Sequence, residues 1–510
     1  MQFHFDNRFV HELPGDPEAD NYRRQVRDAL WSAVAPTAVA NPQLICHSPD
    51  MAARLGLSET DIHSRKFAEV FGGNTLLPGM VPVATRYGGH QFGNWAGQLG
   101  DGRAISLGEV VTAAEQRWEL QLKGAGETPY SRSADGRAVL RSSVREFLCS
   151  EAMYFLGVPT TRALSLVATG DDVVRDMFYD GRAKAEPGAV VCRAAPSFTR
   201  FGHFEILAAH RESELLEELI DFTIERDFSH LTGDNLRARW FGEVVTRTAE
   251  LMAHWMAVGF VHGVMNTDNM SILGLTIDYG PYGWTDNFDL DWTPNTTDAG
   301  QRRYRFGNQP AIGEWNLQRL AMALSLVIDQ QPLIEALQQY PIAYHRALDR
   351  HYAAKLGILD WQPEDKTLVT DLWQLMGDSQ IDMTLFFRRL IEAGSGSPDT
   401  NFIAECSYLP SINSEKWQPW LERYIDRTKT QNSGQRAGLM SAANPVYVLR
   451  NYMAQEAIDL AEKGDYSRIE TLLELLSNPY QVQTGMEQFT EKRPDWALNK
   501  AGCSQLSCSS

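Results

Sequence analysis

Cysteine is scarce in this chain, with six residues in 510, and their spacing matches neither a disulfide framework nor a zinc-binding pattern. The amino terminus has no charged head followed by an apolar run, as a secretion signal would require. No uninterrupted apolar run reaches the length of a membrane span, since the best stretch, residues 252–265, contains two histidines and is too short. These absences predict a cytoplasmic protein that does not associate with membranes.

Basic residues are also in the minority, because 47 lysine and arginine residues face 65 aspartate and glutamate residues, for a net charge of −18. General nucleic-acid binding needs a basic footprint, so this balance argues against it. Nucleotides remain open as ligands, because a local cluster of arginine and lysine is enough to hold three phosphates. The 43% of hydrophobic residues supply ample core material, and the length suits about three domains or one two-lobed unit with extensions.

Composition divides the first part of the chain into three regions. Residues 1–80 are predicted to be an N-terminal helical extension, with an amphipathic segment at 22–34 and a Leu/Ala-rich segment at 51–57. Residues 81–200 are rich in glycine and in alternating strand patterns, and they predict a small, nucleotide-binding lobe. Residues 201–395 have helical periodicity and predict a second, helical lobe that carries the catalytic loop.

Helical patterns continue through the rest of the chain. A helix at 214–226 has Ser213 in front of it as a candidate N-cap, and a long helix is predicted at 236–258. A Gly-Ser-Pro stretch at 394–398 is the best linker, and residues 396–510 predict a C-terminal helical extension with a loose tail. Further helices are predicted at 316–328, 333–347, 446–462 and 466–476.

A glycine-rich stretch opens the small lobe. Its glycines stand at positions 88, 89, 93, 97, 100, 102 and 108. Gly100-Asp101-Gly102-Arg103 leads into residues 104–107, which alternate as a strand does. Backbone N–H groups of such a loop can close around phosphate oxygens, although a string of tight turns would have the same composition.

A lysine and a glutamate follow the glycine-rich stretch in the order that protein kinases use for an ion pair. The predicted strand 118–123 ends in Lys123, and the predicted helix 138–156 carries Glu146. Protein kinases use the order strand, lysine, helix, glutamate for the ion pair that positions a phosphate-binding lysine. The alternatives are a solvated lysine at a strand end and a solvent-exposed Glu146.

Two arginines stand near the junction of the lobes. Strand-like runs precede them at 164–168, 173–179 and 189–193. Arg193 and Arg200 then bracket a short link into the helical region. An isolated arginine is usually a surface residue, but two at such a junction can meet phosphate in a bidentate manner.

Residues 262–280 carry the pattern around which the chain is organised. A polar loop ends in Asp268-Asn269, a brief apolar run follows, and Asp278 precedes a Tyr-Gly pair. Asp268 can take a proton from a hydroxyl, while Asn269 and Asp278 offer hard oxygen ligands that suit Mg²⁺ or Mn²⁺ held with nucleotide phosphates. Protein kinases arrange their catalytic loop and Asp-Phe-Gly segment in this order. A simple turn would account for the loop alone equally well.

These patterns predict an α+β fold, a protein-kinase-like two-lobed fold with N-terminal and C-terminal helical extensions. Seven motifs carry a closer likeness, at residues 87–93, 95–103, 122–126, 128–132, 263–269, 276–281 and 444–451. In this order they resemble the selenoprotein O family of kinase-like protein adenylyltransferases over nearly the whole chain. The resemblance implies ATP bound with its α-phosphate toward the acceptor, AMP transfer to a protein Ser, Thr or Tyr hydroxyl, and release of pyrophosphate. Some bacterial relatives use UTP with Mn²⁺ as well.

The resemblance also implies roles for matched residues. It assigns the nucleotide to Gly100, Gly102, Arg103, Lys123, Asp135, Gly136, Arg193, Arg200 and Asp278. Asp268 is the implied proton acceptor, with Asn269 and Asp278 on the metal, Mg²⁺ or Mn²⁺. Glu146 would hold Lys123, and the two arginines would bind the outer phosphates. One departure from ordinary kinases is that Asp268 and Asn269 are adjacent, whereas kinases separate the two by several residues.

The C-terminal end departs from the family pattern. In some bacterial relatives a cysteine after Asp-Tyr-Gly pairs with a C-terminal cysteine, but residues 290–298 contain none here. Redox control by that bridge is therefore not expected. A pair of Cys503 with Cys508, or a plain mobile tail, are the two alternatives that the sequence leaves open.

Three functions are in competition. The leading hypothesis is a protein adenylyl or uridylyl transferase, with ATP or UTP and a protein as substrates. The second is a protein or small-molecule kinase that transfers the γ-phosphoryl group, and the third is a non-catalytic pseudokinase scaffold. A degenerate site usually lacks at least one functional residue, so the full set of Lys123, Glu146, Asp268, Asn269 and Asp278 weighs against the scaffold.

Overall fold

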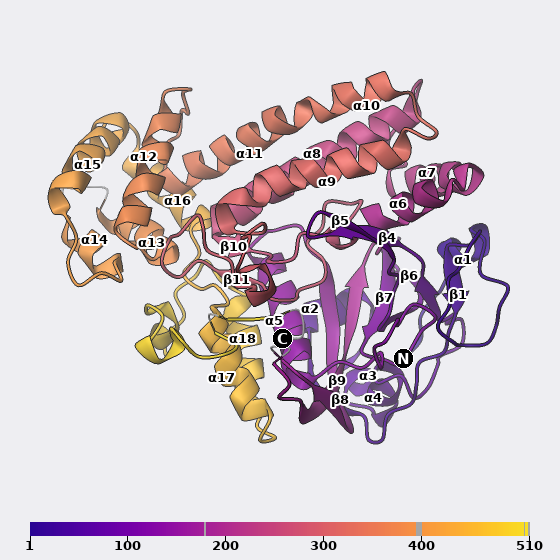
Figure 1. Cartoon of the computed structure of the whole chain (residues 1–510). Coiled ribbons are helices and arrows are strands. Elements are labelled where there is room, and N and C mark those ends of the chain that lie inside the picture. The colour runs from indigo at the N-terminus through magenta and orange to yellow at the C-terminus, as the bar shows by residue number, and fades with distance from the viewer. Residues whose placement is uncertain (178–179, 394–399, 504, 508–510) are drawn as a thin grey trace.

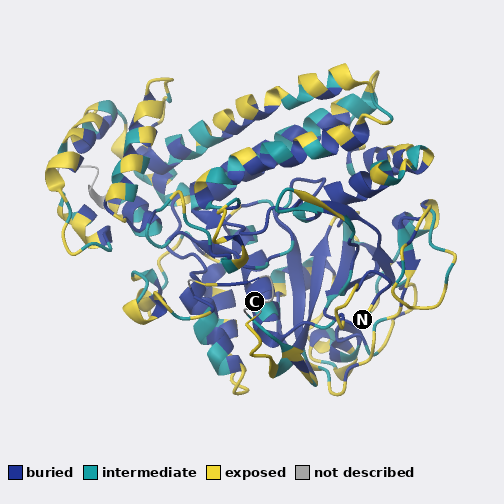
Figure 2. Ribbon diagram, viewed as in Figure 1, coloured by how far each residue is buried: buried dark blue, intermediate teal, exposed yellow. Residues whose placement is uncertain are grey.

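The computed structural model describes residues 1–177, 180–393, 400–503 and 505–507. A strand-rich lobe comes first, a helical lobe follows, and the C-terminal helices return to pack beside the first lobe (Figure 1). Buried residues run through the sheet and along the inner faces of the helices (Figure 2). The chain therefore has the α+β, two-lobed arrangement that the sequence predicts, with a helical C-terminal region.

The central sheet organises the first lobe. Within the described residues it is antiparallel and has seven strands, in the order β1 (Trp31–Ala33), β3 (Val83–Thr85), β6 (Ala104–Val111), β7 (Arg117–Lys123), β9 (Lys184–Ala195), β8 (Arg162–Arg175) and β2 (Gln43–His47). Leu120 and Leu122 on β7 are fully buried, so the alternate residues Gln121 and Lys123 point to the opposite face. The period-2 pattern thus aims Lys123 away from the core beneath the sheet.

Helices cover both faces of this sheet. The N-terminal helices are α1 (Arg8–Glu12), α2 (Pro49–Arg54), α3 (Glu59–Ile62) and α4 (Arg65–Phe71), and α2 to α4 share an apolar core with β6 and β7. On the other face, α5 (Leu140–Phe155) packs against β8 and β9. A separate two-stranded sheet, β4 (Gly88–Gln91) and β5 (Asn94–Gln98), lies between this sheet and the helical lobe (Figure 1).

The predicted helix at 22–34 is wrong. Asp28 is in the left-handed region at φ 51°, and Trp31–Ala33 is a strand that pairs with β3. The N–H groups of Leu30 and Val34 donate to carbonyl oxygens of other segments, at 2.9 and 3.2 Å. Bonds to the N-terminal segment at Pro14 and to Pro82 beside β3 satisfy these backbone groups, so the tertiary structure overrides the helical spacing of the side chains. The division of the chain at residue 80 stays a prediction.

The second lobe is built on long helices. They are α6 (Phe201–His210), α7 (Ser213–Asp227), α8 (Leu236–Val258), α9 (Gln309–Leu324), α10 (Gln330–Leu337), α11 (Gln339–Leu356), α12 (Asp365–Asp378), α13 (Met383–Ala393), α14 (Asn401–Cys406), α15 (Ser414–Thr428) and α16 (Ser433–Ala443). Helix α8 has the predicted bounds and stops at Gly259, whose φ is 73°. Ser213 is not an N-cap, because α7 begins at Ser213 itself and Glu212 precedes it.

Short elements between α8 and α9 carry the loop that the sequence predicts to be catalytic. They are the strands β10 (Phe260–Val261) and β11 (Gly283–Trp284) and the 3₁₀ turns η1 (Thr267–Asn269), η2 (Thr296–Asp298) and η3 (Phe306–Asn308). Two further 3₁₀ turns, η4 (Glu487–Thr490) and η5 (Asp495–Ala497), follow the last described helix. Antiparallel pairing of β10 with β11 closes residues 262–282 into a loop. This loop presents η1 and Asp278 to the strand-rich lobe.

The C-terminal helices α17 (Asn451–Ala461) and α18 (Ser467–Leu476) pack on α5. The predicted helix start at 446 is wrong, because the N–H groups of Val446 and Tyr447 donate to the carbonyl oxygen of Pro479. The described part of the tail is not loose, since Leu506 is fully buried and its backbone forms hydrogen bonds with residues 294 and 296.

The predicted linker at 394–398 and Cys508 lie outside the described residues. Of the helices that the structure describes, none combines the length and apolarity needed to cross a membrane.

Candidate active site

A cleft of about 670 Å³ lies between the strand-rich lobe and the loop that carries η1. Its lining includes the predicted residues Gly100, Gly102, Arg103, Lys123, Asp135, Gly136, Arg193, Asp268, Asn269 and Asp278. Glu146 and Arg200 lie behind this lining, where each contacts a residue that forms it. The tertiary structure therefore gathers all twelve predicted positions at one place, although they span 179 residues of sequence from Gly100 to Asp278.

The glycine-rich loop forms part of the cleft wall. Gly100 has φ 71°, and a Cβ there would collide with the Tyr130 ring, so this position requires glycine. Asp101 is buried, and its carboxylate accepts hydrogen bonds from the N–H and hydroxyl of Thr85 at 2.9 and 2.5 Å. This anchor fixes the loop between β5 and β6. The sequence reasoning assigned no role to Asp101 or Tyr130.

Lys123 and Glu146 form a close ion pair, with Nζ 2.6 Å from Oε2. Lys123 comes from the end of β7 and Glu146 from α5, where it is 3% exposed. Burial lowers the pKa of Lys123, and the charge of Glu146 acts against that shift. Glu146 therefore faces Lys123 rather than solvent.

Asp278 is the centre of a cluster of cations. Arg193 and Arg200 each donate from Nη1 to its carboxylate, and the Lys123 Nζ lies 3.8 Å away. Burial alone would raise the pKa of Asp278, but these three cations outweigh it and hold the pKa well below its ordinary value. The residue has φ 56°, a conformation that non-glycine residues adopt rarely and often at functional sites. Asp278 is thus a firmly ionised carboxylate on the cleft wall.

The two arginines are almost completely buried, at 2% and 1% exposure. Arg193 lines the cleft and also contacts Glu146 at 3.0 Å. Arg200 lies beneath Asp278, donates to the carbonyl oxygen of Asp268 at 2.9 Å, and covers the Tyr87 ring at 4.6 Å from its centroid. Both guanidinium groups therefore face Asp278 in this structure.

Asp268 has a very different environment. It lies in η1 at 7% exposure, and burial raises its pKa to about 7. Its Oδ2 accepts a hydrogen bond of 3.3 Å from the Gln91 Nε2, whereas Oδ1 is buried and has no hydrogen-bond partner among the described residues. A carboxylate with a pKa near neutrality has the properties of a general base.

The oxygen atoms that Asn269 and Asp278 offer on the cleft wall fit a hard divalent cation that binds together with phosphate oxygens. Asn269 uses its Nδ2 to donate to the Val264 carbonyl at 3.0 Å, so its amide oxygen is left for a ligand. With Asp278 it supplies two oxygen ligands, the set that Mg²⁺ uses when phosphates and water complete the octahedron. Across the described ranges, no cluster of three or more His, Cys, Asp or Glu side chains could hold a metal by itself.

The charges of the lining favour an anionic ligand. Six cations face the cleft, Arg103, Lys123, Arg132, Arg137, Arg175 and Arg193. They outnumber the four carboxylates of Asp101, Asp135, Asp268 and Asp278. In a chain of net charge −18 this local excess of cations suits a polyphosphate.

Three side chains at the site were missed from the sequence. Arg175 bonds the Asp135 carboxylate at 2.6 Å, which lowers the pKa of Asp135. Gln121 accepts a hydrogen bond from Arg193, and Gln91 donates to Asp268. Gln121 could have been found, because strand periodicity puts it on the same face as Lys123, two residues later. No local signal linked Gln91 or Arg175 to their partners.

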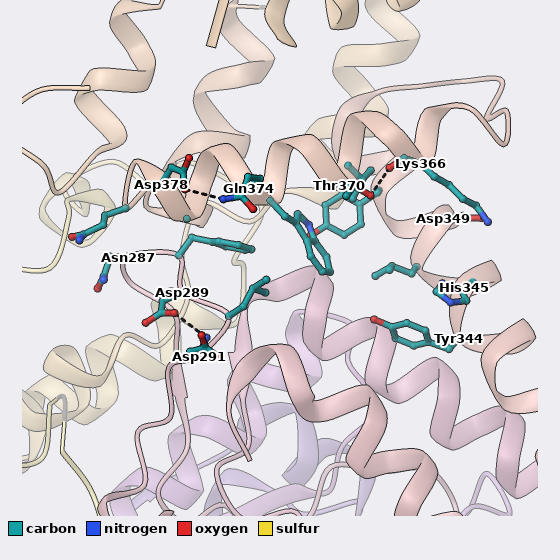
Figure 3. A pocket seen from close by; sticks show the side chains of 18 of the residues that line it. Asn287, Asp289, Asp291, Tyr344, His345, Asp349, Lys366, Thr370, Gln374 and Asp378 are labelled. Carbon is teal, nitrogen blue, oxygen red and sulfur yellow. Dashed lines mark hydrogen bonds and ion pairs between the residues drawn. The ribbon is translucent and has the colours of Figure 1, made fainter. Parts of the chain in front are cut away.

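Other cavities lie away from this chemistry. One of about 780 Å³ lies between α11, α12 and residues 287–291, where Asp289 and Asp291 face the α12 side chains across the opening (Figure 3). Another of about 1100 Å³ lies between β2 and α18. Neither is lined by the lysine, glutamate and aspartate cluster of the cleft, so the smaller cleft is the candidate active site.

Sequence comparisons with known proteins cover almost the whole chain. The model of the family described as protein adenylyltransferase SelO matches residues 19–477. The chain is 59% identical over 514 residues to protein nucleotidyltransferase YdiU of Azoarcus sp. (strain BH72), covering 99% of each. It is 57% identical over 516 residues to the protein of the same name from Tolumonas auensis, again covering 99% of each. Among solved structures, ROP2 from Toxoplasma gondii, described as a virulence factor with a protein-kinase fold and no enzymatic activity, aligns at TM-score 0.23 and 11% identity, over 79% of this chain and 84% of that one.

Proposed function

Since this chain belongs to the family of protein adenylyltransferase SelO, we propose that its cleft transfers AMP from ATP to hydroxyl groups of proteins and releases pyrophosphate. Family membership makes it an enzyme, a protein nucleotidyltransferase whose substrates are a nucleotide and a protein. The choice of ATP, of the Ser, Thr or Tyr hydroxyl and of a divalent metal is our proposal.

One observation carries this assignment. Lys123, Arg193 and Arg200 surround Asp278, and nearby Asp268 has an oxygen, Oδ1, without a hydrogen-bond partner among the described residues. Nucleotidyl transfer needs cations to neutralise the phosphates and a base to accept the proton of the acceptor hydroxyl. The cluster can supply the first and Asp268 the second. What sets Asp268 apart from a carboxylate whose pKa is raised by packing alone is its position in the cleft, beside this cluster of cations.

The residues that line the cleft then have separate roles in binding the nucleotide and its phosphates. Gly100, Gly102 and Arg103 surround the nucleotide, with Asp135 and Gly136 on the same side of the cleft. Lys123, held by Glu146, binds a phosphate oxygen, and Arg193 and Arg200 bind the outer phosphates. Because both arginines pair with Asp278 here, phosphate binding must draw them from that carboxylate. Phosphate can compete for them, because arginine forms charge-assisted, bidentate hydrogen bonds with phosphate as well as with carboxylate.

Asn269 and Asp278 would hold Mg²⁺ or Mn²⁺. When bound, such a cation neutralises phosphate charge and orients the reacting phosphate. The pairing of Asp278 with three cations supports this role, because it keeps the carboxylate ionised at all pH values near neutrality.

Asp268 accepts the proton from the acceptor hydroxyl. The oxygen of that hydroxyl forms a bond to the α-phosphorus, and the bond between the α-phosphorus and the pyrophosphate oxygen breaks. The electron pair of the broken bond leaves with pyrophosphate, so charge and atoms balance. Asp268 returns the proton to solvent when the product leaves.

The position of the label in ATP tests this function against the alternatives. The chain is incubated with Mg²⁺, casein as an acceptor probe, and ATP labelled at either the α or the γ phosphate. We expect α-label on protein, on casein or on the chain itself, and none from γ-labelled ATP. Label from the γ position alone would identify a kinase, and no label from either would identify a scaffold. The same assay with UTP and Mn²⁺ tests for UMP transfer, and Asp278→Asn is the inactive control.

A further inference from the structure

The β4–β5 hairpin covers the catalytic loop, and the proposed function gives it no task. It turns at Phe92 and Gly93, whose φ angles of 50° and 86° are both left-handed. The His90 N–H donates to the Thr267 hydroxyl at 2.7 Å, and the Phe92 N–H donates to the Tyr304 hydroxyl at 2.9 Å. The first bond docks the hairpin directly on η1, the turn that contains Asp268. The second ties it to Tyr304, whose hydroxyl donates to the Asn266 Oδ1 just before η1 at 2.6 Å.

Gly89 brings the hairpin backbone against one oxygen of Asp268. A Cβ at position 89 would lie 2.6 Å from the Asp268 Oδ1, and 2.9 Å from its Cβ. This distance is too short for any side chain, so the close approach depends on glycine. Oδ1 is buried under this glycine and is without a hydrogen-bond partner in the described part of the chain. An acceptor hydroxyl cannot reach it while the hairpin is docked.

Gln91 contacts the other oxygen. Its Nε2 donates to the Asp268 Oδ2 at 3.3 Å. Because Asp268 lines the cleft and Oδ1 is covered, Oδ2 is the oxygen that faces the cleft. Gln91 lines the same cleft, so its amide and an acceptor hydroxyl would meet the carboxylate at the same oxygen.

We infer that Gln91 is a positioning residue that, together with Gly89, sets the rotation of the Asp268 carboxylate so that Oδ2 takes the proton of the acceptor hydroxyl. Without the amide, no other side chain among the described residues bonds the carboxylate, and only the packing of Gly89 against Oδ1 would limit its rotation about the Cβ–Cγ bond. A misdirected base slows transfer without weakening nucleotide binding, since small errors in geometry at the reacting atoms are costly. This inference rests on the proposed function, in which Asp268 is the base.

A double-mutant cycle tests the coupling between Gln91 and Asp268. Gln91→Met keeps the length of the side chain and removes the donor, and it is made in the wild-type and the Asp268→Ala backgrounds. We expect kcat for α-label transfer to casein or the chain itself to fall about tenfold to a hundredfold in the wild-type background, as for loss of a hydrogen bond to a charged group, with the KM for ATP unchanged. In the Asp268→Ala background the same change should cost nothing further.

A merely structural role for Gln91 would give a different result. Equal losses in the two backgrounds, or no loss in the wild type, would overturn the inference. Gln91→Asn keeps the donor on a chain one methylene shorter, and an intermediate rate is expected from it. A rate for Gln91→Asn as low as that of Gln91→Met would also count against positioning by the amide.

Gly89→Ala probes the other oxygen and uses no hydrogen-bond donor. Its methyl group would enter the space of Oδ1, so kcat should fall at least as far as in Gln91→Met while the KM for ATP stays the same. Asn94→Ala is the matched control, because Asn94 is exposed on β5 of the same hairpin. Thermal melting of all variants checks the fold. If Gly89→Ala folds and transfers label at the normal rate, the packing of Gly89 against Oδ1 does not set the rotation of the Asp268 carboxylate, and that part of the inference is overturned.

Failure of the inference can be told apart from failure of the proposed function. A normal rate in Asp268→Ala would overturn the role of Asp268 as base, and this inference with it. A slow Asp268→Ala together with a normal Gln91→Met would overturn this inference alone.

Discussion

Two carboxylates of the cleft, Asp278 on the proposed phosphate side and Asp268 on the proposed acceptor side, are ten residues apart and have opposite environments. Asp278 is surrounded by Lys123, Arg193 and Arg200, and its pKa is held well below the ordinary value. Asp268 has one oxygen without a partner among the residues described, and burial raises its pKa to about 7. One group is always charged near neutrality, and the other can gain and lose a proton.

This difference separates two chemical tasks within one loop. A ligand for cations and phosphates must stay ionised, whereas a base must change its protonation state at the working pH. The protein sets both states through surroundings alone, with arginines around one carboxylate and a glycine-containing hairpin over the other. The same substitution at the two positions should therefore have distinguishable effects.

The largest effect is expected from Asp278→Asn. Removing the negative charge takes away a proposed metal ligand and leaves three cations without their central carboxylate. Transfer of α-label should fall about a thousandfold or more, in line with the loss of a principal electrostatic stabiliser. Calorimetry should also show weaker binding of ATP in the presence of Mg²⁺. A variant that melts near the wild-type temperature and labels protein normally would remove Asp278 from the site.

Asp268→Asn should be slower than wild type by roughly a hundredfold or more, as general-base contributions are. The amide keeps the shape of the carboxylate but accepts no proton, and the phosphate side is untouched. Calorimetric ATP affinity should therefore remain near normal, in contrast to Asp278→Asn. The single-turnover rate at saturating ATP and Mg²⁺ is the measurement. An unchanged rate would make Asp268 a structural residue of η1.

Arg193→Gln and Arg200→Gln test which phosphates the cations meet. If they bind the outer phosphates, each change should weaken ATP about tenfold to a hundredfold and leave AMP nearly unaffected, because AMP lacks those phosphates. Titration calorimetry with ATP and AMP gives both affinities. If the affinities for ATP and AMP fell equally, the arginines would not bind the outer phosphates, and their role would be to hold Asp278.

Glu119 on β7 is expected to affect stability rather than transfer, and it provides a control for the comparison. It is buried at 8% exposure, accepts a hydrogen bond from the Phe198 N–H at 3.0 Å, and does not line the cleft. Burial, with the nearby charge of Glu109, raises its pKa from 4.5 to about 7. A raised pKa therefore arises here from packing, without any catalytic role.

The sign of the effect of Glu119 on stability follows from linkage. Between pH 4.5 and about 7 the folded protein keeps a proton that the unfolded chain has released. The stability that this proton contributes is complete below pH 4.5 and is lost as the pH rises through about 7. Over that window the free energy of unfolding of wild type should fall by roughly 3 kcal/mol more than that of Glu119→Gln. Urea unfolding at pH 5 and pH 8 measures the difference, and parallel curves would contradict it.

The sequence pattern was most informative where local physics decides the outcome. Helix α8 has the predicted bounds because its apolar periodicity is sustained and Gly259 supplies a left-handed end. The order of Lys123, Glu146, Asp268 and Asp278 along the chain was enough to predict a cleft of kinase type. The helix at 22–34 failed because its apolar spacing also suits an extended segment that pairs with β3.

By itself, then, the sequence determined which side chains could do the chemistry, since residue type fixes charge, donors and acceptors. Only the tertiary structure decided what each side chain faces. It turned Arg193 and Arg200 onto Asp278, and it brought Gly89 and Gln91 of a distant hairpin onto Asp268. The physical reason is that pKa and orientation depend on burial and on neighbours remote in the chain, here 177 residues from Gln91 to Asp268.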